Sequence, residues 1–194
     1  MTRYWLIIFA LLIVAVAGVT VAIKQEPVPL KVPAQPSFLD DPKYIAFGKR
    51  RYRIMEMEDA AEHGQLPSEP DTKELLAEVR SNDTDWRIRT YAMSLMPFLP
   101  DRESAIDALI AAASDRDPKS VGSGVVPMCA VTYLAKMKAI RAEPAIRDWI
   151  RFIEQDTKGA VLPGSRQLIL SVAKRDLAAI ESAKTATTQP TTQN

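Results

Sequence analysis

The stretch DTDWRIRTYAMSLMPFLPDRESAIDALIAAASDRD, residues 83–117, decides the fold. It holds two apolar stripes at helical spacing: Ile88, Tyr91, Ala92, Leu95 and Leu99, then Ile106, Leu109, Ile110 and Ala113. A spacing of i, i+3, i+4 and i+7 is typical of a helix with one buried face. The stretch therefore predicts two successive helices. Pro97 should kink or fray the last turn of the first helix, and Pro100 should end it.

Both stripes recur further along the chain. Ala130, Tyr133, Leu134 and Met137 match Ala92, Leu95, Met96 and Leu99 at an offset of 38 residues. Ile146, Trp149, Ile150 and Ile153 match the second stripe at an offset of 40 residues. Repeats of about 40 residues with two helices each are typical of an α-solenoid, in which stacked pairs bury one continuous core.

Two further signals set the limits of this helical region. Asp71 with Glu74 predicts a capped helix start, and a last helix from about Ser165 has one apolar side, made of Leu170, Ala173, Leu177 and Ile180. We therefore predict an all-α domain over 71–182, a short α-solenoid of about three helix pairs. The Thr/Gln-rich segment 183–194 has no apolar periodicity and is expected to be a disordered tail.

Region 71–182 resembles the HEAT-repeat family. The matching segments are the turn and helix over residues 83–92 and the turn Asp115-Arg116-Asp117-Pro118. The family pattern is an aspartate-rich turn, then an arginine, then a small alanine at the helix contact; Arg87 or Arg89 fits the arginine and Ala92 the alanine. The second repeat has Gly-Ser-Gly at 122–124 where the arginine is expected, and the third lacks the aspartate turn. The resemblance implies a superhelix with a binding face and no chemistry of its own.

The amino-terminal residues 4–23 contain no charged side chain. A helix of that length spans about 30 Å, the thickness of the bilayer hydrocarbon. We predict a single transmembrane anchor over 1–23 that contacts the lipid bilayer through 4–23. The alternative is a cleaved signal peptide, because 15–17 and 20–22 are small-x-small patterns. The positive charges on the two sides of this apolar run are nearly balanced. The short amino-terminal tail favours a single-pass protein whose soluble domain is extracytoplasmic.

Beyond the apolar run, residues 24–40 are rich in proline and predict a semi-rigid linker. Asp41-Pro42 and His63-Gly64 then mark the start and the end of a membrane-proximal helix over 41–64. This helix carries the bases Lys49, Arg50, Arg51 and Arg53, followed by the acids Glu56, Glu58, Asp59 and Glu62. One interpretation of the bases is contact with anionic lipid or an acidic partner. The other is a solvated face with internal ion pairs.

Composition restricts the chemistry. Lys and Arg number 25 against 24 Asp and Glu, a net charge of +1, which excludes a strongly basic nucleic-acid binder. One cysteine and one histidine exclude a disulfide framework within the chain and a multi-thiolate or His-rich metal site. Cys129 is expected to be buried and structural, and His63 to cap a helix. We interpret four turn aspartates as helix caps: Asp83, Asp85, Asp115 and Asp117. We interpret Trp86 and Trp149 as packing residues.

These observations predict a membrane-anchored, non-catalytic scaffold or adaptor that binds protein partners through the helical repeats. No catalytic, metal or cofactor residue is expected, and neither a nucleic acid nor a small-molecule substrate is expected as a partner. The alternative is an envelope enzyme, or an enzyme-maturation subunit, built on HEAT-like repeats. It would require a polar cleft with perturbed ionisable groups.

Overall fold

A computed structural model of the chain describes residues 41–117, 124–156, 161 and 163–188. The predicted anchor over 1–23 and the linker over 24–40 lie outside the described residues. Within the described ranges the secondary structure is entirely helical. No helix in these ranges combines the length and the apolar character needed to cross a bilayer.

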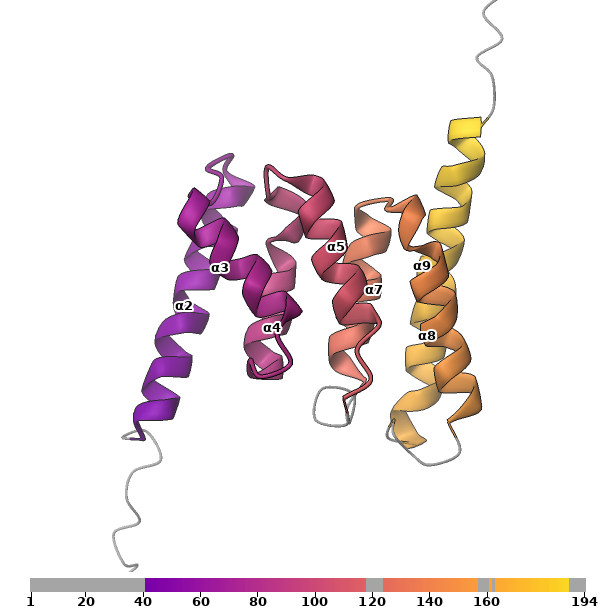
Figure 1. Ribbon diagram of the computed structural model, residues 1–194, viewed down its shortest axis with the longest axis horizontal. Helices are drawn as coiled ribbons and strands as arrows, with labels where there is room; N and C mark the ends of the chain where they lie inside the picture. Colours follow the sequence, from indigo (N-terminus) through magenta and orange to yellow (C-terminus); the bar gives the residue numbers. More distant parts are fainter. Residues whose placement is uncertain (1–40, 118–123, 157–160, 162, 189–194) are drawn as a thin grey trace, which may run out of the picture. The chain divides into compact units, whose positions relative to one another are not determined.

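The helices follow one another along the chain and in space, from α2 to α9 in Figure 1. Their bounds are α2 (Pro42–Glu62), α3 (Glu69–Arg80), α4 (Trp86–Ser94), η2 (Met96–Phe98), α5 (Arg102–Ala113), α7 (Val125–Lys136), η3 (Ile140–Ala142), α8 (Glu143–Gln155) and α9 (Pro163–Thr188). The elements η2 and η3 are single turns of 3-10 helix. Pro97 lies in η2, so the predicted distortion of that helix end is confirmed.

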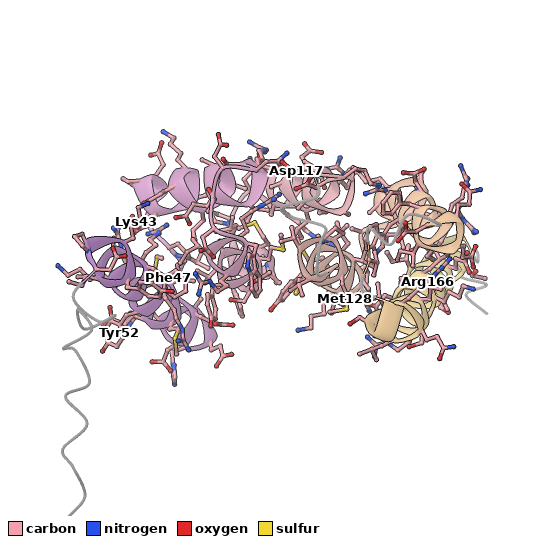
Figure 2. All side chains as sticks on the ribbon, turned by 90° about the horizontal axis from the view of Figure 1, so that it is seen from below. Lys43, Phe47, Tyr52, Asp117, Met128 and Arg166 are labelled. Carbon is pink, nitrogen blue, oxygen red and sulfur yellow. The ribbon has the colours of Figure 1, made fainter. Side chains whose placement is uncertain are left out.

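The helices form two layers. One layer is α3, α5 and α8, and the other is α2, α4, α7 and α9, with each helix packed against the next in its layer. Across the layers, α3 packs on α4, α5 on α7, and α8 on α9. Figure 2 shows both rows: Asp117 follows α5 in one, and Met128 belongs to α7 in the other. This stack of helix pairs is compatible with an α-solenoid.

A single core runs through the stack, from Ile54 in α2 to Ile180 in α9. The predicted stripes supply much of it. Ala92, Leu95, Met96 and Leu99 are buried, and so are Ala130, Leu134 and Met137. The stripe over 146–153 is buried throughout. Tyr133 and Ile110 are the half-buried members of the two repeated patterns.

Two predicted boundaries were wrong. The first repeat helix begins after Ser68, not at Asp71, because Ser68 and Asp71 cap it reciprocally: the Asp71 N–H donates to Ser68 Oγ at 3.3 Å, and that hydroxyl donates to Asp71 Oδ2 at 2.6 Å. The last helix continues through Thr188, so residues 183–188 are not a disordered tail. The buried side of α9 is Ile169, Ala173, Asp176 and Ile180, with Leu170 and Leu177 at its margin.

The tail residues stay helical because they satisfy their own polar groups. The hydroxyls of Ser182, Thr185 and Thr187 donate to carbonyl oxygens four residues earlier, at 2.8, 3.0 and 2.9 Å. Lys184 Nζ lies 2.9 Å from Glu143 Oε2 on α8. These bonds tie the last turns of α9 to themselves and to the neighbouring helix.

Gly124 is a position where the fold requires glycine. It precedes α7 with φ of +66°, and a Cβ atom there would lie 2.5 Å from Ile169 Cδ1 on α9. We expect Gly124→Ala to lower the free energy of unfolding by about 1–3 kcal/mol, through backbone strain and overpacking. Urea unfolding followed by circular dichroism measures this. Gly164→Ala is the control, since no atom of the described residues lies within 4 Å of its added carbon; an equal loss in both variants would contradict the explanation.

Candidate interaction surface

The four bases of α2 do not form one patch. Arg50 reaches α3, where its Nε and Nη2 donate to the two carboxylate oxygens of Glu78 at 2.6 and 2.8 Å. Arg53 pairs with Asp71, also on α3. Lys49 and Arg51 are exposed. Arg50 and Arg53 therefore hold α2 against α3, and the ion pairs run between helices rather than along α2.

Arg51 takes part in a different cluster, which we call the tyrosine surface: Arg51, Tyr91, Tyr133 and Lys136. The guanidinium of Arg51 lies 5.1 Å from the centre of the Tyr91 ring on α4. On α7, the ammonium group of Lys136 lies 4.6 Å from the centre of the Tyr133 ring. α2, α4 and α7 are successive helices of one layer, and Tyr133 interacts with Ser94 of α4 and with Glu58 of α2, which places the two cation–π pairs near each other.

Both tyrosines of this surface are half-buried, so each ring has a packed side and an accessible side. Burial raises the pKa of the Tyr133 hydroxyl, and the nearby Glu58 carboxylate raises it further. The phenol is therefore neutral, and its hydroxyl can donate a hydrogen bond. Half-buried aromatic residues with a polar tip are typical of protein interfaces.

Cys129 lies on α7, one turn before Tyr133, and is half-buried rather than fully buried. Burial raises the pKa of its thiol, so the protonated form dominates and the sulfur is a weak nucleophile. His63 lies at the end of α2, where its Nδ1 is 2.7 Å from the carbonyl oxygen of Asp59. In the described part of the chain, no three or more His, Cys, Asp or Glu residues are grouped so that they could hold a metal ion.

The turn aspartates divide into two kinds. Asp85 caps α4, as predicted: its Oδ1 accepts the Arg87 N–H at 2.9 Å, and its hydrogen bonds to Arg87 lower the pKa of the carboxyl. Asp115, in contrast, pairs with an arginine of α4. Its carboxylate is buried and accepts from Arg89 Nη1 at 2.7 Å. Arg89 is therefore buried with its partner, whereas the guanidinium of Arg87 lies 4.3 Å from the centre of the Phe47 ring on α2.

A cleft of about 420 Å³ opens between the amino-terminal ends of α3 and α5. It is lined by Pro67, Glu69, Thr72, Lys73, Leu76, Pro100, Asp101 and Ser104. Hydrogen bonds from the Ser104 hydroxyl and backbone lower the pKa of Asp101, which caps α5, and Glu69 pairs with Lys73 at 2.6 Å. A general acid at neutral pH needs a raised carboxyl pKa. This arrangement holds Asp101 ionised, as a helix cap.

Comparisons with known protein families, curated proteins and solved structures found no match to this chain. The case for a function accordingly rests on the residues and their geometry. The feature that stands out chemically is the tyrosine surface, which combines accessible aromatic rings with cations on three consecutive helices of one layer.

Proposed function

We propose that this chain is a membrane-anchored, non-catalytic module that binds a protein partner through the surface of its HEAT-like helical repeats. The observation that carries the proposal is the tyrosine surface on the α2, α4 and α7 layer. In this proposal the anchor is residues 4–23, and the helical domain lies on the extracytoplasmic side. The resemblance to HEAT repeats supports a binding role, since such stacks offer extended surfaces to partners.

The chemistry of the tyrosine surface suggests the kind of partner. Tyrosine supplies large contact area at a low entropic cost, and it is enriched among residues that dominate binding energy. Arg51 and Lys136 have no carboxylate within ion-pair distance in the described part of the chain. A partner segment that carries Asp or Glu beside an apolar residue would contact the rings and neutralise both cations.

The test is cross-linking and affinity capture of the full-length chain from its own membranes. We expect the unmodified chain to recover a defined partner, and the double variant Tyr91→Ala/Tyr133→Ala to recover at least about tenfold less, since each ring is a candidate hot spot. Leu168→Ala is the matched control, because that side chain is 63% exposed on α9, a helix that contributes no residue to the tyrosine surface.

Circular dichroism separates binding from folding in this test. The double variant should keep its helical content, because both rings are only half-buried. Unchanged recovery of the partner by a folded double variant would refute the proposed surface. A partner that binds Leu168→Ala less well than the double variant would place the contact on another part of the stack.

A further inference from the structure

Helix α2 has two apolar faces. One face packs into the core through Phe47, Ile54 and Ala61. The opposite face, which we call the outer face of α2, carries Ile45, Gly48, Tyr52 and Met55. Ile45, Tyr52 and Met55 are 44%, 64% and 45% exposed, and nothing lies within 4 Å of a Cβ added at Gly48. In Figure 2, Phe47 lies on the side of α2 toward the stack, and Tyr52 lies on the side away from it.

The outer face has the spacing of a helix–helix seam. From Ile45 its positions follow at three, four and three residues, which is the a/d pattern of a heptad repeat. A stripe this narrow suits a single partner helix better than a broad surface. In the described part of the chain no helix covers it, since its large side chains are exposed.

The charges beside the seam reverse halfway along α2. Lys49 and Arg51 flank its first half, and Glu56 and Glu58 flank its second half. Lys49 and Glu56 lie on one edge of the seam, and Arg51 and Glu58 on the other. A helix with bases at one end and acids at the other is complementary to a copy of itself that runs in the opposite direction.

We propose that the outer face of α2 binds the outer face of α2 in a second copy of this chain, antiparallel and about a two-fold axis. Tyr52 then packs on Met55 of the second copy at the centre of the seam, and on either side of this centre Gly48 lies opposite Asp59 and Ile45 lies opposite Glu62. With that register, heptad geometry sets Lys49 against Glu56, and Arg51 against Glu58, across the seam. Because of the two-fold axis each ion pair occurs twice, so all four of these charged side chains are paired in both copies.

The charges also select this register. Sliding one copy by a heptad in one direction sets Ile45 against Met55 and Gly48 against Tyr52, but it also sets Lys49 against Lys49 and Arg51 against Arg51. Sliding it in the other direction sets Glu56 against Glu56 and Glu58 against Glu58. Like charges in direct opposition disfavour both alternatives, so one alignment is singled out.

A bilayer is the less favoured occupant of this face. Glu56, Asp59 and Glu62 lie along its second half, and Glu56 and Asp59 are exposed. Their charge repels an anionic lipid surface. The same carboxylates are attractive toward the bases of a second copy, which is why the charge pattern favours self-association.

The decisive experiment is a charge swap at the edge of the seam. Lys49→Glu and Glu56→Lys alter exposed residues, so the fold of each variant should be intact. The full-length chain in neutral detergent micelles is studied by sedimentation equilibrium at matched density. We expect the unmodified chain to dimerise, and each variant alone to dimerise about tenfold less tightly, because two attractive pairs become repulsive.

Mixing the two variants should restore the dimer, since the carboxylate introduced in one variant then faces the ammonium group introduced in the other, and the remaining pairs are natural. In a parallel arrangement Lys49 would face Tyr44, so Lys49→Glu would have little effect. Tyr52→Ala should weaken association at least about tenfold through the seam itself, while Leu66→Ala, exposed outside the seam, should leave it unchanged. A monomeric unmodified chain, or a dimer insensitive to Lys49→Glu and Tyr52→Ala, would overturn the proposal.

Vesicle binding gives an independent check on the occupant. Full-length protein is reconstituted in vesicles of neutral lipid alone or with anionic lipid, and association is followed by energy transfer between labelled copies. Energy transfer that depends on Tyr52 in both lipids supports the dimer. Protection of Tyr52 in anionic vesicles without energy transfer would assign the face to lipid and overturn the proposal. Arg51 belongs to both surfaces, so the capture experiment is read from Tyr91 and Tyr133, which lie outside the seam.

Discussion

Replacing Arg89 with alanine should lower the free energy of unfolding by about 3–5 kcal/mol, because it leaves a buried carboxylate without its counterion. The side chains of Arg89 and Asp115 are only 1% and 3% exposed. Arg89 also donates through Nε and Nη2 to the carbonyl oxygen of Val79, at 3.3 and 3.1 Å. One side chain thus joins the end of α3, the start of α4 and the turn after α5.

The measurement is urea unfolding of the chain from residue 24 onward. Arg141→Ala is the control: its exposed ion pairs with Glu103 and Asp107 should contribute at most about 1 kcal/mol. Asp115→Asn retains an oxygen that can accept from the Asp117 N–H, which donates to Asp115 Oδ1 at 2.8 Å. The double variant Arg89→Met/Asp115→Asn should lose less stability than the two single losses added together. Simple additivity would show that the two charges act independently.

Replacing Trp149 with alanine should also lower the free energy of unfolding by about 3–5 kcal/mol, the usual cost of removing a fully buried aromatic side chain. Trp149 lies on α8, is completely buried, and stacks on Phe152 with ring centres 5.5 Å apart. The guanidinium of Arg116 lies 5.1 Å from the centre of the Trp149 ring and 4.8 Å from that of Phe152. The cavity left by Trp149→Ala would therefore open beneath a cation–π contact.

Phenylalanine at this position distinguishes packing from hydrogen bonding. Trp149 Nε1 is buried and has no hydrogen-bond partner among the described residues, so Trp149→Phe removes an unsatisfied donor while it keeps an aromatic ring. We expect Trp149→Phe to lose less than half as much free energy of unfolding as Trp149→Ala. Trp86→Ala serves as the control, because Trp86 is 42% exposed and its removal should change stability by only about 0.5 kcal/mol. A Phe variant as unstable as the Ala variant would mean that the indole nitrogen has a stabilising partner.

The apolar stripes predicted the helices well because each stripe is a local property of the chain. Ile146, Trp149 and Ile153 recur at helical spacing, and a helix is the only regular structure that puts them on one side. The role of Asp115 was not predictable in this way. Its partner Arg89 is 26 residues away, and a turn aspartate followed by polar residues has the local pattern of a helix cap.

Helix α2 and the end of α9 show two other limits. The stripe on α2 looks imperfect in sequence because apolar residues occupy both its core face and its outer face, and one-face periodicity cannot describe that arrangement. The residues after Ala183 look disordered because they are small and polar. In the structure they continue α9, and Lys184 pairs with Glu143 on a different helix, a contact that no local pattern could predict. The tyrosine surface could not be predicted from sequence, because its four residues come from three helices.

The layered stack has a consequence for cooperativity. Among the described helices, the main packing contacts join neighbours in the stack. In such a one-dimensional array the free energy of opening is lowest at the termini and highest at the centre. The α5 and α7 pair is flanked on both sides and should open last, whereas α2 frays first because one of its sides is bare. A second copy bound along α2 would act as the missing terminal repeat, so that association and the folding of this end become a single thermodynamic event.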